Sequence, residues 1–326
     1  MKKIITLLFI TAGFTATAQD DLLSLLDSTN APKMHEKVIA TFKTSKIINI
    51  QSTETVKKGT MDFRVTHRFG NIGGASGGGA HTLVGLDNST DIRISFDFGI
   101  TDNLTLGFAR SKQNEMLDGL LKYRILTQTT DNHVPISLAL YCDMGYTPMA
   151  ANQFYNGVQE PYAFKQTEIH RFSYVTQLLI ARKFGSRLSL ELVPSYQHRN
   201  FVVANVNPSN GATETNDLMS IGGGFRIKMT KRISFIADYF YNFSKYRTNN
   251  AATPFYNPLA VGIEIETGGH VFHLNFTNAS GIIENNYLVN TTDDWTKGGY
   301  KFGFNISRVF NLTKKTKKAP PVKAVH

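Results

Sequence analysis

Cysteine and long apolar runs are scarce in this sequence of 326 residues, and each shortage excludes a class of protein. The single cysteine, Cys142, rules out an intramolecular disulfide framework and a cysteine-based metal cluster. After residue 18, no stretch approaches the roughly 20 consecutive apolar residues that a membrane-spanning helix requires. If the mature chain resides in a membrane, it must therefore cross as a β-barrel or bind at the surface.

Positive charge is concentrated at the two ends of the chain. The formal net charge is +10, but two lysines lie in residues 1–18 and five in residues 311–326, which leaves +3 for residues 19–310. The first 18 residues combine two lysines, an apolar stretch and the small residues of Ala16–Ala18, a pattern typical of a secretory signal peptide. The basic end, residues 312–326, favours a solvated, disordered tail over a nucleic-acid-binding arm.

Residues 91–110 show the period of two that recurs through most of the chain. Apolar residues alternate with polar or small ones up to Ile100, and the alternation resumes at Leu104 after Thr101–Asn103. Because successive side chains of a strand point to opposite faces, this pattern predicts a hairpin with one apolar and one polar face. A three-residue loop pairs Ile100 with Leu104 and keeps the apolar residues on one side.

The same alternation predicts twelve strands, each about as long as a tilted transmembrane strand requires. They are expected near 60–70, 90–100, 104–111, 116–127, 134–146, 171–184, 187–199, 218–229, 231–243, 258–267, 270–279 and 299–310. The predicted fold is all-β, a transmembrane up-and-down antiparallel β-barrel of about 12 strands. A secreted soluble β-protein is the alternative.

The connections between these strands alternate between short and long, with the brief link 112–115 as the exception. Tight turns are expected at 101–103, 185–187, 230–232 and 268–269, whereas polar stretches such as 147–170 and 280–298 are long. Outer-membrane barrels sort their connections in this way, because their periplasmic turns are tight and their outer loops are long. This alternation of short and long connections predicts a bacterial outer-membrane location with both termini in the periplasm.

The segment 38–50 does not fit the wall of this barrel. Counting it as a strand gives thirteen, whereas single-chain bacterial barrels have an even number. We therefore expect four regions: a signal peptide (1–18), an N-terminal periplasmic or lumenal segment (19–56), the β-barrel (57–311) and a basic tail (312–326). Within the barrel, Gly222–Gly224 predicts either a bulge in the wall or a close approach by another segment, such as this plug.

Turn geometry supplies a check on register. A two-residue turn at Gly268-Gly269 pairs Glu264 with His273, and a three-residue loop at 185–187 pairs Phe184 with Leu188. In both hairpins the apolar faces of the two strands then coincide, which supports the strand assignment.

The polar face of the strands carries charges of both signs, which is typical of a hydrated or salt-bridged lumen. The residues expected to face the lumen are Arg64, Arg68, Arg93, Asp97, Lys122, Arg124, Glu191, Arg226, Lys228, Asp238, Glu264 and His273. Aromatic residues near strand ends suit the girdles that outer-membrane barrels place at the membrane interfaces. These are Tyr239, Tyr241, Phe243, Tyr246, Tyr300, Phe302 and Phe304.

The sequence contains few patterns that point to chemistry. His270 and His273 fall on opposite faces of a strand, so no shared metal site is expected, and Glu264 with His273 favours a structural ion pair over a weak cation site. The glycine-rich stretch 70–79 lacks the ending of a phosphate-binding loop and is interpreted as a mobile outer loop. We expect no catalytic residues, no metal and no cofactor.

A lipid-hydrolysing barrel is the enzymatic alternative. Such an enzyme would need a serine and a histidine on the outer wall. His67 is the histidine expected to face outward from a clear strand, but no serine can be assigned beside it and no GxSxG motif occurs. The sequence favours an interfacial histidine, and we expect the protein not to be an enzyme.

Four stretches also resemble a known family. VIATFKTSKIIN (38–49), KKGTMDFRVTHRFG (57–70), FDFGITDNLTLGFARS (96–111) and DGLLKYRILTQ (118–128) are similar to an uncharacterised family of β-barrel proteins from Bacteroidota, a domain of unknown function. The likeness extends over about residues 37–311. It implies an outer-membrane barrel of Gram-negative origin and adds no substrate or residue role.

The sequence thus predicts a porin-like channel or transporter for a small hydrophilic solute, with an N-terminal plug. The alternative is a closed scaffold that binds a periplasmic protein partner through its loops or its basic tail. Outer-membrane lipid is expected as the surroundings, and nucleic acid is not expected as a partner.

Overall fold

A computed structural model of the chain describes residues 35–155 and 167–312. Nearly all of them belong to one compact unit, Glu36–His326. The predicted signal peptide and nearly all of the basic tail lie outside the described residues.

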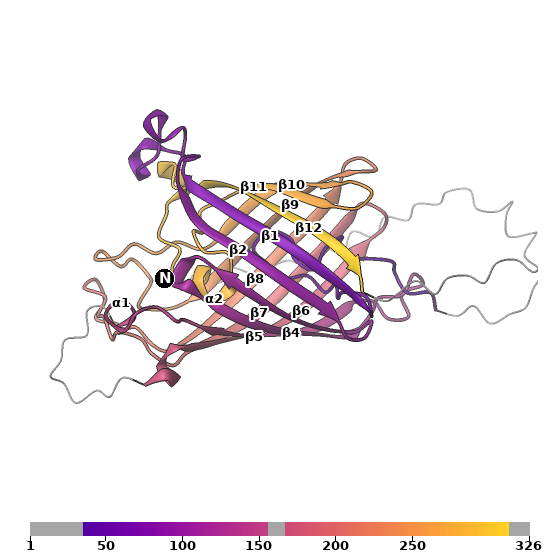
Figure 1. Ribbon diagram of the computed structural model, residues 1–326, viewed down its shortest axis with the longest axis horizontal. Helices are drawn as coiled ribbons and strands as arrows, with labels where there is room; N and C mark the ends of the chain where they lie inside the picture. Colours follow the sequence, from indigo (N-terminus) through magenta and orange to yellow (C-terminus); the bar gives the residue numbers. More distant parts are fainter. Residues whose placement is uncertain (1–34, 156–166, 313–326) are drawn as a thin grey trace, which may run out of the picture. The chain divides into compact units, whose positions relative to one another are not determined.

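Twelve antiparallel strands form a closed barrel in which each strand pairs with its neighbours in the sequence and β12 pairs with β1 (Figure 1). The strands are β1 (Thr60–Asn71), β2 (Ser89–Gly99), β3 (Leu104–Ser111), β4 (Leu117–Leu126), β5 (Ser137–Tyr146), β6 (Phe172–Phe184), β7 (Leu188–Arg199), β8 (Asp217–Lys228), β9 (Ile233–Phe243), β10 (Leu259–Glu266), β11 (Val271–Thr277) and β12 (Lys301–Asn311). The predicted fold class is confirmed.

The register of the strands follows the turn chemistry. Phe184 pairs with Leu188 across the β6–β7 turn, and Glu264 pairs with His273 across the β10–β11 turn, as expected. The Ile100 N–H donates to the Leu104 carbonyl at 2.9 Å, which closes the β2–β3 turn. The period-two pattern and the short loops therefore suffice to set the ladder.

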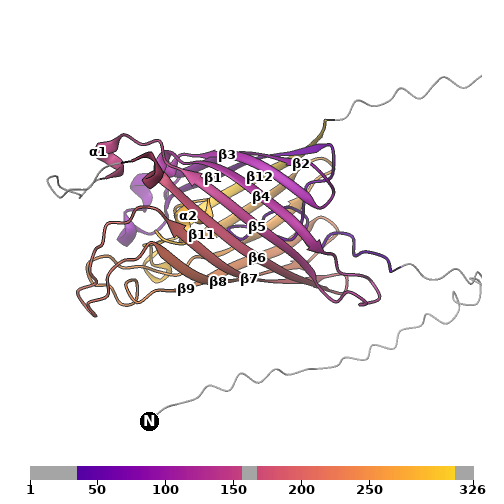
Figure 2. The ribbon, with the colours of Figure 1, turned by 90° about the horizontal axis from the view of Figure 1, so that it is seen from below.

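Most short connections lie at one end of the barrel, here called the tight-turn end, and most long ones lie at the other, here called the long-loop end (Figures 1 and 2). The connections at the long-loop end carry α1 (Ala151–Phe154), α2 (Glu284–Tyr287) and the 3-10 turns η1 (Gly74–Ser76), η2 (Ala80–Thr82), η3 (Gln113–Glu115), η4 (Glu168–Arg171) and η5 (Trp295–Lys297). Residue 312 lies at the tight-turn end, where the Leu312 N–H donates to the Gly59 carbonyl at 2.9 Å.

Apolar side chains cover the outside of the wall. Residues such as Leu106, Phe108 and Leu192 are among the most exposed large side chains, whereas their strand neighbours are buried inside. Tyr246 departs from the predicted aromatic girdle: it is only 5% exposed, because it packs in the β9–β10 connection beside Arg247 and Phe255. No helix in the described ranges is long and apolar enough to cross a membrane.

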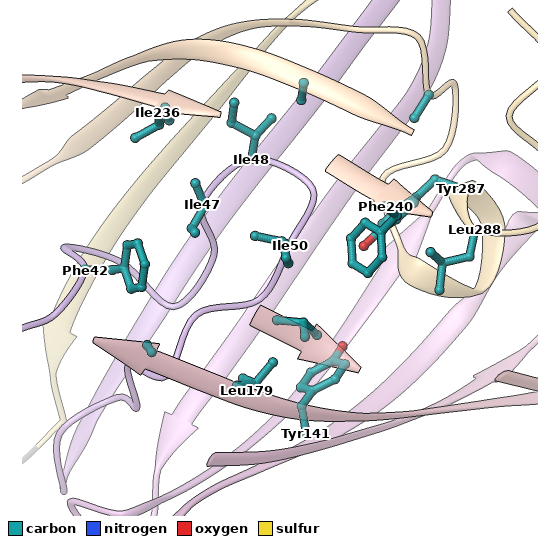
Figure 3. Close-up of a cluster of buried hydrophobic side chains, with 14 of the residues drawn as sticks. Phe42, Ile47, Ile48, Ile50, Tyr141, Leu179, Ile236, Phe240, Tyr287 and Leu288 are labelled. Carbon is teal, nitrogen blue, oxygen red and sulfur yellow. The ribbon is translucent and has the colours of Figure 1, made fainter. Parts of the chain in front are cut away.

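The interior of the barrel is filled by protein. Residues 41–53 lie inside it and pair with no wall strand, and residues 279–291 enter from the long-loop end (Figures 1 and 3). Apolar side chains of both segments form one buried cluster with apolar residues on the inner face of β4–β9. The largest members are Phe42, Ile47, Ile48, Ile50, Leu120, Tyr141, Leu179, Leu218, Ile236, Phe240, Tyr287 and Leu288. The expected hydrated lumen is thus occupied by a packed core.

Candidate functional site

Residues 41–53 form a short hairpin inside the barrel, here called the plug. The Ile47 N–H donates to the Ile50 carbonyl, and the Ser52 N–H donates to the Ser45 carbonyl, each at 2.9 Å. Lys46 and Gln51 form an isolated bridge between the two arms. The hairpin satisfies part of its own backbone, so it needs no place in the wall ladder.

A single wall carboxylate holds the tip of the plug. Asp238 on β9 accepts hydrogen bonds at Oδ2 from the backbone N–H groups of Ile48, Asn49 and Ile50, at 3.1, 2.7 and 3.3 Å. Three successive N–H groups that converge on one anion form a backbone nest, and this geometry suits a negative charge. Asp238 is 2% exposed, so little water competes for these bonds.

Cationic side chains of the wall hold the base of the plug. Lys122 Nζ donates to the carbonyls of Ser45 at 2.7 Å and Ser52 at 3.0 Å. Arg64 Nη2 donates to Ser45 Oγ at 3.0 Å. These two cations come from β1 and β4, so separate strands of the wall converge on the plug.

The plug also packs against glycine residues of the wall. A Cβ placed on Gly224 of β8 would lie 2.9 Å from Ile47 Cδ1 and 3.2 Å from Ile50 Cγ2. The β7–β8 register runs without interruption through Gly222–Gly224, so these glycines mark no bulge. Of the two predictions for this stretch, close approach by the plug is the one the structure shows at Gly224.

The second segment, residues 279–291, contacts the plug from the long-loop end of the barrel. Lys46 Nζ of the plug lies 3.2 Å from Glu284 Oε1, and the Tyr287 hydroxyl donates to the Asn49 carbonyl at 3.2 Å. Gln51 Nε2 donates to the same Glu284 oxygen at 3.1 Å. Figure 3 shows the Tyr287 and Leu288 side chains near the plug tip. The four residues of α2 are all buried, although they lie in a connection between strands.

Burial sets the protonation of this contact. It lowers the pKa of Lys46 below its ordinary value of 10.5, and the neighbouring Glu284 opposes that shift. Burial also raises the pKa of Tyr287 well above 10, and Glu284 reinforces the effect. Tyr287 is thus neutral at physiological pH, and its hydroxyl can donate a hydrogen bond to the Asn49 carbonyl.

The predicted lumen residues fall into three groups. Arg64, Arg68, Lys122, Arg124 and Asp238 contact the plug directly, and Arg68 donates to Asn49 Oδ1 and to the carbonyls of Ala279 and Gly281 in the second segment.

The second group is a wall cluster near the tight-turn end. Arg226 Nε lies 2.7 Å from Glu264 Oε1, and His273 Nε2 lies 3.3 Å from Glu264 Oε2. The expected contact between Glu264 and His273 is present. In the described ranges no group of three or more His, Cys, Asp or Glu residues is placed to hold a metal ion.

The third group comprises the remaining four residues, among which Glu191 lies next to the backbone of Thr53 in the plug. Arg93 pairs with Asp118 at 2.5 Å, while Asp97 and Glu191 are buried and Lys228 lies half-buried near the β8 end. In strand register all twelve residues share the face opposite the exposed apolar side chains, and their role in lining a lumen stays a prediction.

His67 lies on the outer face among aromatic rings. Its ring stacks on Phe304 at a centroid distance of 5.5 Å and lies 4.2 Å from the ring of Phe69. Within the described residues no hydrogen bond joins it to a serine. The contacts present are those of an interfacial aromatic cluster.

Sequence reasoning missed Lys46 and Glu284. Residues 280–298 were interpreted as a polar outer loop, yet Ile282, Ile283 and Val289 in this stretch are apolar and fully buried. An apolar cluster inside a long polar connection was the available signal that the segment is buried.

A cavity lies at the long-loop end, next to α2. Its volume is about 580 Å³, and its lining comes from several connections together with Asn285, Asn286, Val289 and Asn290. The 279–291 segment, which contacts the plug, therefore also lines this cavity.

An apolar outer wall, a closed ladder and a filled interior define a membrane-bound β-barrel with an internal plug. Residues 42–310 match the family described as "Membrane bound beta barrel domain" (DUF5777), and the chain belongs to this family. The matched range includes the plug as well as the wall. The expected family, an uncharacterised one, is confirmed, and the comparison with curated proteins gives no match.

Several solved structures share the barrel fold at low sequence identity. A NanC porin is 8% identical with a TM-score of 0.45, covering 76% of this chain and 98% of that chain. A KdgM porin is 7% identical with a TM-score of 0.39, covering 77% and 98%. An outer-membrane channel from Pseudomonas putida F1 is 13% identical with a TM-score of 0.41, covering 79% and 98%. These similarities concern the fold alone.

Proposed function

We propose that this protein is an outer-membrane channel for a small hydrophilic solute and that the plug holds it closed. The observation that carries the proposal is that all twelve strands pair with one another, so the wall closes without any residue of the plug. The plug is thus an addition to a complete barrel. Its release would leave the wall ladder intact.

The wall behind the plug supports a hydrophilic pathway. Lys122, Arg124, Arg64 and Asp238 face the interior and now bond to the plug. Once the plug is released, these groups are free to bind water or a polar solute, and the inner face presents charges of both signs. Such a lining favours small hydrophilic solutes over apolar ones.

The orientation follows from the loops. Tight turns face the periplasm in outer-membrane barrels and long loops face outward, so both ends of the chain are periplasmic in this proposal. Residues 1–18 are then the signal peptide for export, and the plug enters and leaves from the periplasmic side. The residues that precede it lie near that side, since the Val38 N–H donates to the Gln128 carbonyl of the β4–β5 turn at 2.8 Å.

Single-channel conductance in a planar bilayer tests the proposal. The ends of the plug are close together, because the Thr41 N–H donates to Glu54 Oε1 at 2.9 Å, so residues 42–53 can be replaced by two glycines. The shortened protein should show discrete, frequent current steps, and the intact protein should show rare ones. The control is Lys58→Ala, which removes an exposed side chain outside the plug. A folded but silent shortened barrel would refute the channel.

A second candidate is a closed scaffold, and the packed interior supports it. Ile47, Ile48 and Ile50 are at most 3% exposed, as in the core of a soluble domain. In that case the basic tail Lys314–Lys323, outside the described residues, would dock an acidic periplasmic protein. Truncation at residue 312 should then abolish co-purification of that partner. The expectation that the protein is not an enzyme stays a prediction.

A further inference from the structure

The charged wall groups around the plug bind mainly its backbone. Asp238 of β9 accepts hydrogen bonds at Oδ2 from the three successive N–H groups of residues 48–50, at 3.1, 2.7 and 3.3 Å. Lys122 and Arg124 of β4 together donate to the carbonyls of residues 52, 53 and 54, at 3.0, 3.1 and 3.4 Å. The wall thus binds a row of peptide donors at one place and a row of peptide acceptors at another.

Two of these charged groups depend on the plug for their partners. In the described ranges, every hydrogen bond of the Asp238 carboxylate and of the Lys122 ammonium goes to residues 45–54. Each of the two side chains is 2% exposed, and a buried charge without a hydrogen-bonding partner is strongly unfavourable. When the plug is released, water or a ligand must therefore take its place.

An apolar surface accompanies these polar groups. Ile47 and Ile50 of the plug belong to one buried cluster with Leu179 and Ile236 of the wall (Figure 3). Gly224 leaves room for the plug, because a Cβ at that position would lie 2.9 Å from Ile47 Cδ1. The surface therefore suits a chain that carries apolar side chains on a hydrogen-bonding backbone.

Peptides combine these features in one molecule, since their backbone supplies both N–H and carbonyl groups. A free peptide adds an ammonium group for Asp238 and a carboxylate for Lys122 and Arg124, and charge-assisted hydrogen bonds are stronger than neutral ones. An inorganic ion supplies charge of one sign only. A sugar supplies hydroxyl groups but no apolar side chains for the surface beside Gly224.

We propose that the inner wall uncovered by release of the plug binds short peptides with apolar side chains, mainly through their backbone, and that such peptides are the solute of the channel. The plug then occupies this surface as an internal competitor. The second part of the inference rests on the proposed function, whereas the binding surface stands on the contacts of the plug.

Fluorescence anisotropy of a labelled peptide with the sequence of residues 44–53 tests the surface. The full mature chain carrying Lys46→Met leaves the buried Glu284 without its cation, which frees the plug. The peptide should bind this variant about tenfold more tightly than the original protein, in which the plug covers the surface. The shortened protein, with two glycines in place of residues 42–53, should bind as tightly as Lys46→Met.

Substitutions in the wall locate the binding groups. In the Lys46→Met background, Asp238→Asn or Lys122→Met should weaken peptide binding about tenfold. Asp294→Asn is the matched control, because that carboxylate caps turn η5 at the long-loop end. Retained heat-modifiable migration of each variant shows that its barrel is folded, so lost binding then reports on the surface.

Changes in the peptide separate backbone recognition from recognition of the plug's own sequence. N-methylation of the three amides that correspond to residues 48–50 should abolish binding, because these amides lose the N–H groups that Asp238 accepts. Alanine in place of the serine and threonine residues should retain binding within about tenfold. Maltose should not displace the peptide.

Four results would overturn the binding surface. The peptide binds neither plug-free variant, it binds the original protein equally well, N-methylation costs no more than the alanine changes, or maltose displaces it.

Proteoliposome swelling separates this inference from the channel itself. With the Lys46→Met protein, the tripeptide alanyl-isoleucyl-alanine should enter faster than maltose. Equal entry of both solutes would overturn the peptide as the preferred solute and retain the channel. Peptide binding without any entry or current would refute the channel and retain the binding surface.

Discussion

The plug and the 279–291 segment fill the same interior but are attached to the barrel differently. The second segment connects β11 to β12, so the wall holds both of its ends. The plug joins the wall covalently only through β1, and its other side is held at the tight-turn end by contacts such as the Lys37–Thr129 bridge. The chain therefore tethers the plug to the wall on one side and the second segment on both sides.

The forces on the two segments differ as well. Wall groups bond mainly to the backbone of the plug: Asp238 accepts from three N–H groups, and Lys122 donates to carbonyls. Contacts of this type hold a defined backbone shape and tolerate changes in the side chains. The meeting point of the segments, in contrast, depends on the Lys46–Glu284 pair. The following predictions separate these contributions, from the largest expected effect to the smallest.

Lys46→Met should have the largest effect, because it leaves Glu284 buried without its cation. Removing one partner of a buried ion pair costs about 3–5 kcal/mol. The plug should be released, which conductance and urea unfolding in detergent would both detect. The double variant Lys46→Met with Glu284→Met should recover most of the loss. A double variant as unstable as the single one would show that the pair is not the critical contact.

Asp238→Ala should release the plug tip without disturbing the second segment. Three N–H groups lose their acceptor, at about 1 kcal/mol each, so the open population should rise roughly 100-fold. Amide exchange should increase at residues 48–50 and remain unchanged at 284–287. Asp294→Ala is the control, since that carboxylate caps the exposed turn η5. Equal effects of both variants would contradict the anchoring role.

Gly224→Ala should weaken the fit of the plug by about 1–3 kcal/mol, the usual result of overpacking. The added Cβ meets Ile47 Cδ1 at 2.9 Å, whereas a Cβ on the adjacent Gly223 meets nothing closer than 3.8 Å. Gly223→Ala is therefore the matched control and should be nearly neutral. Ile47→Val should relieve part of the strain in the Gly224→Ala background. Similar losses at both glycines would mean that backbone effects dominate.

Raising the pH should strengthen closure slightly. Release of the plug returns Lys46 to water and to its ordinary pKa of 10.5, which lies above its pKa in the closed state. The open state therefore binds more protons in the window between these two values, and closure gains stability as pH rises through it. Open probability should fall as the pH rises toward about 9.5, below the range in which a released tyrosine ionises. The double variant Lys46→Met with Glu284→Met, which should stay closed, should lack this contribution of Lys46, and an unchanged slope would contradict the assignment.

The wall could be predicted almost completely from the sequence, because its determinants are local. Period-two alternation and turn chemistry act within about twenty residues, and the Phe184–Leu188 and Glu264–His273 registers followed from them. Excluding 38–50 from the wall required only an even number of strands.

The interior could be predicted only in part. Charged residues on the polar face stood out, whereas the apolar inward positions Leu179, Leu218 and Phe240 did not, although both faces of those strands carry apolar residues. The Lys46–Glu284 contact joins residues 238 positions apart, and no periodicity signals such a pair. The structure of the interior depends on side-chain packing between distant segments, which the alternation of residues along a strand does not report.

The closed ladder also fixes the order in which the molecule can assemble. Thr60 pairs with Asn311, so the last seam joins residues at opposite ends of the barrel sequence, and such distant pairing is slow. The groups that receive the plug lie on β1, β4, β8 and β9 and come together only when that seam is made. We therefore expect the plug to dock after this seam has formed. Protection of residues 41–53 from protease during biogenesis would report that the barrel is complete.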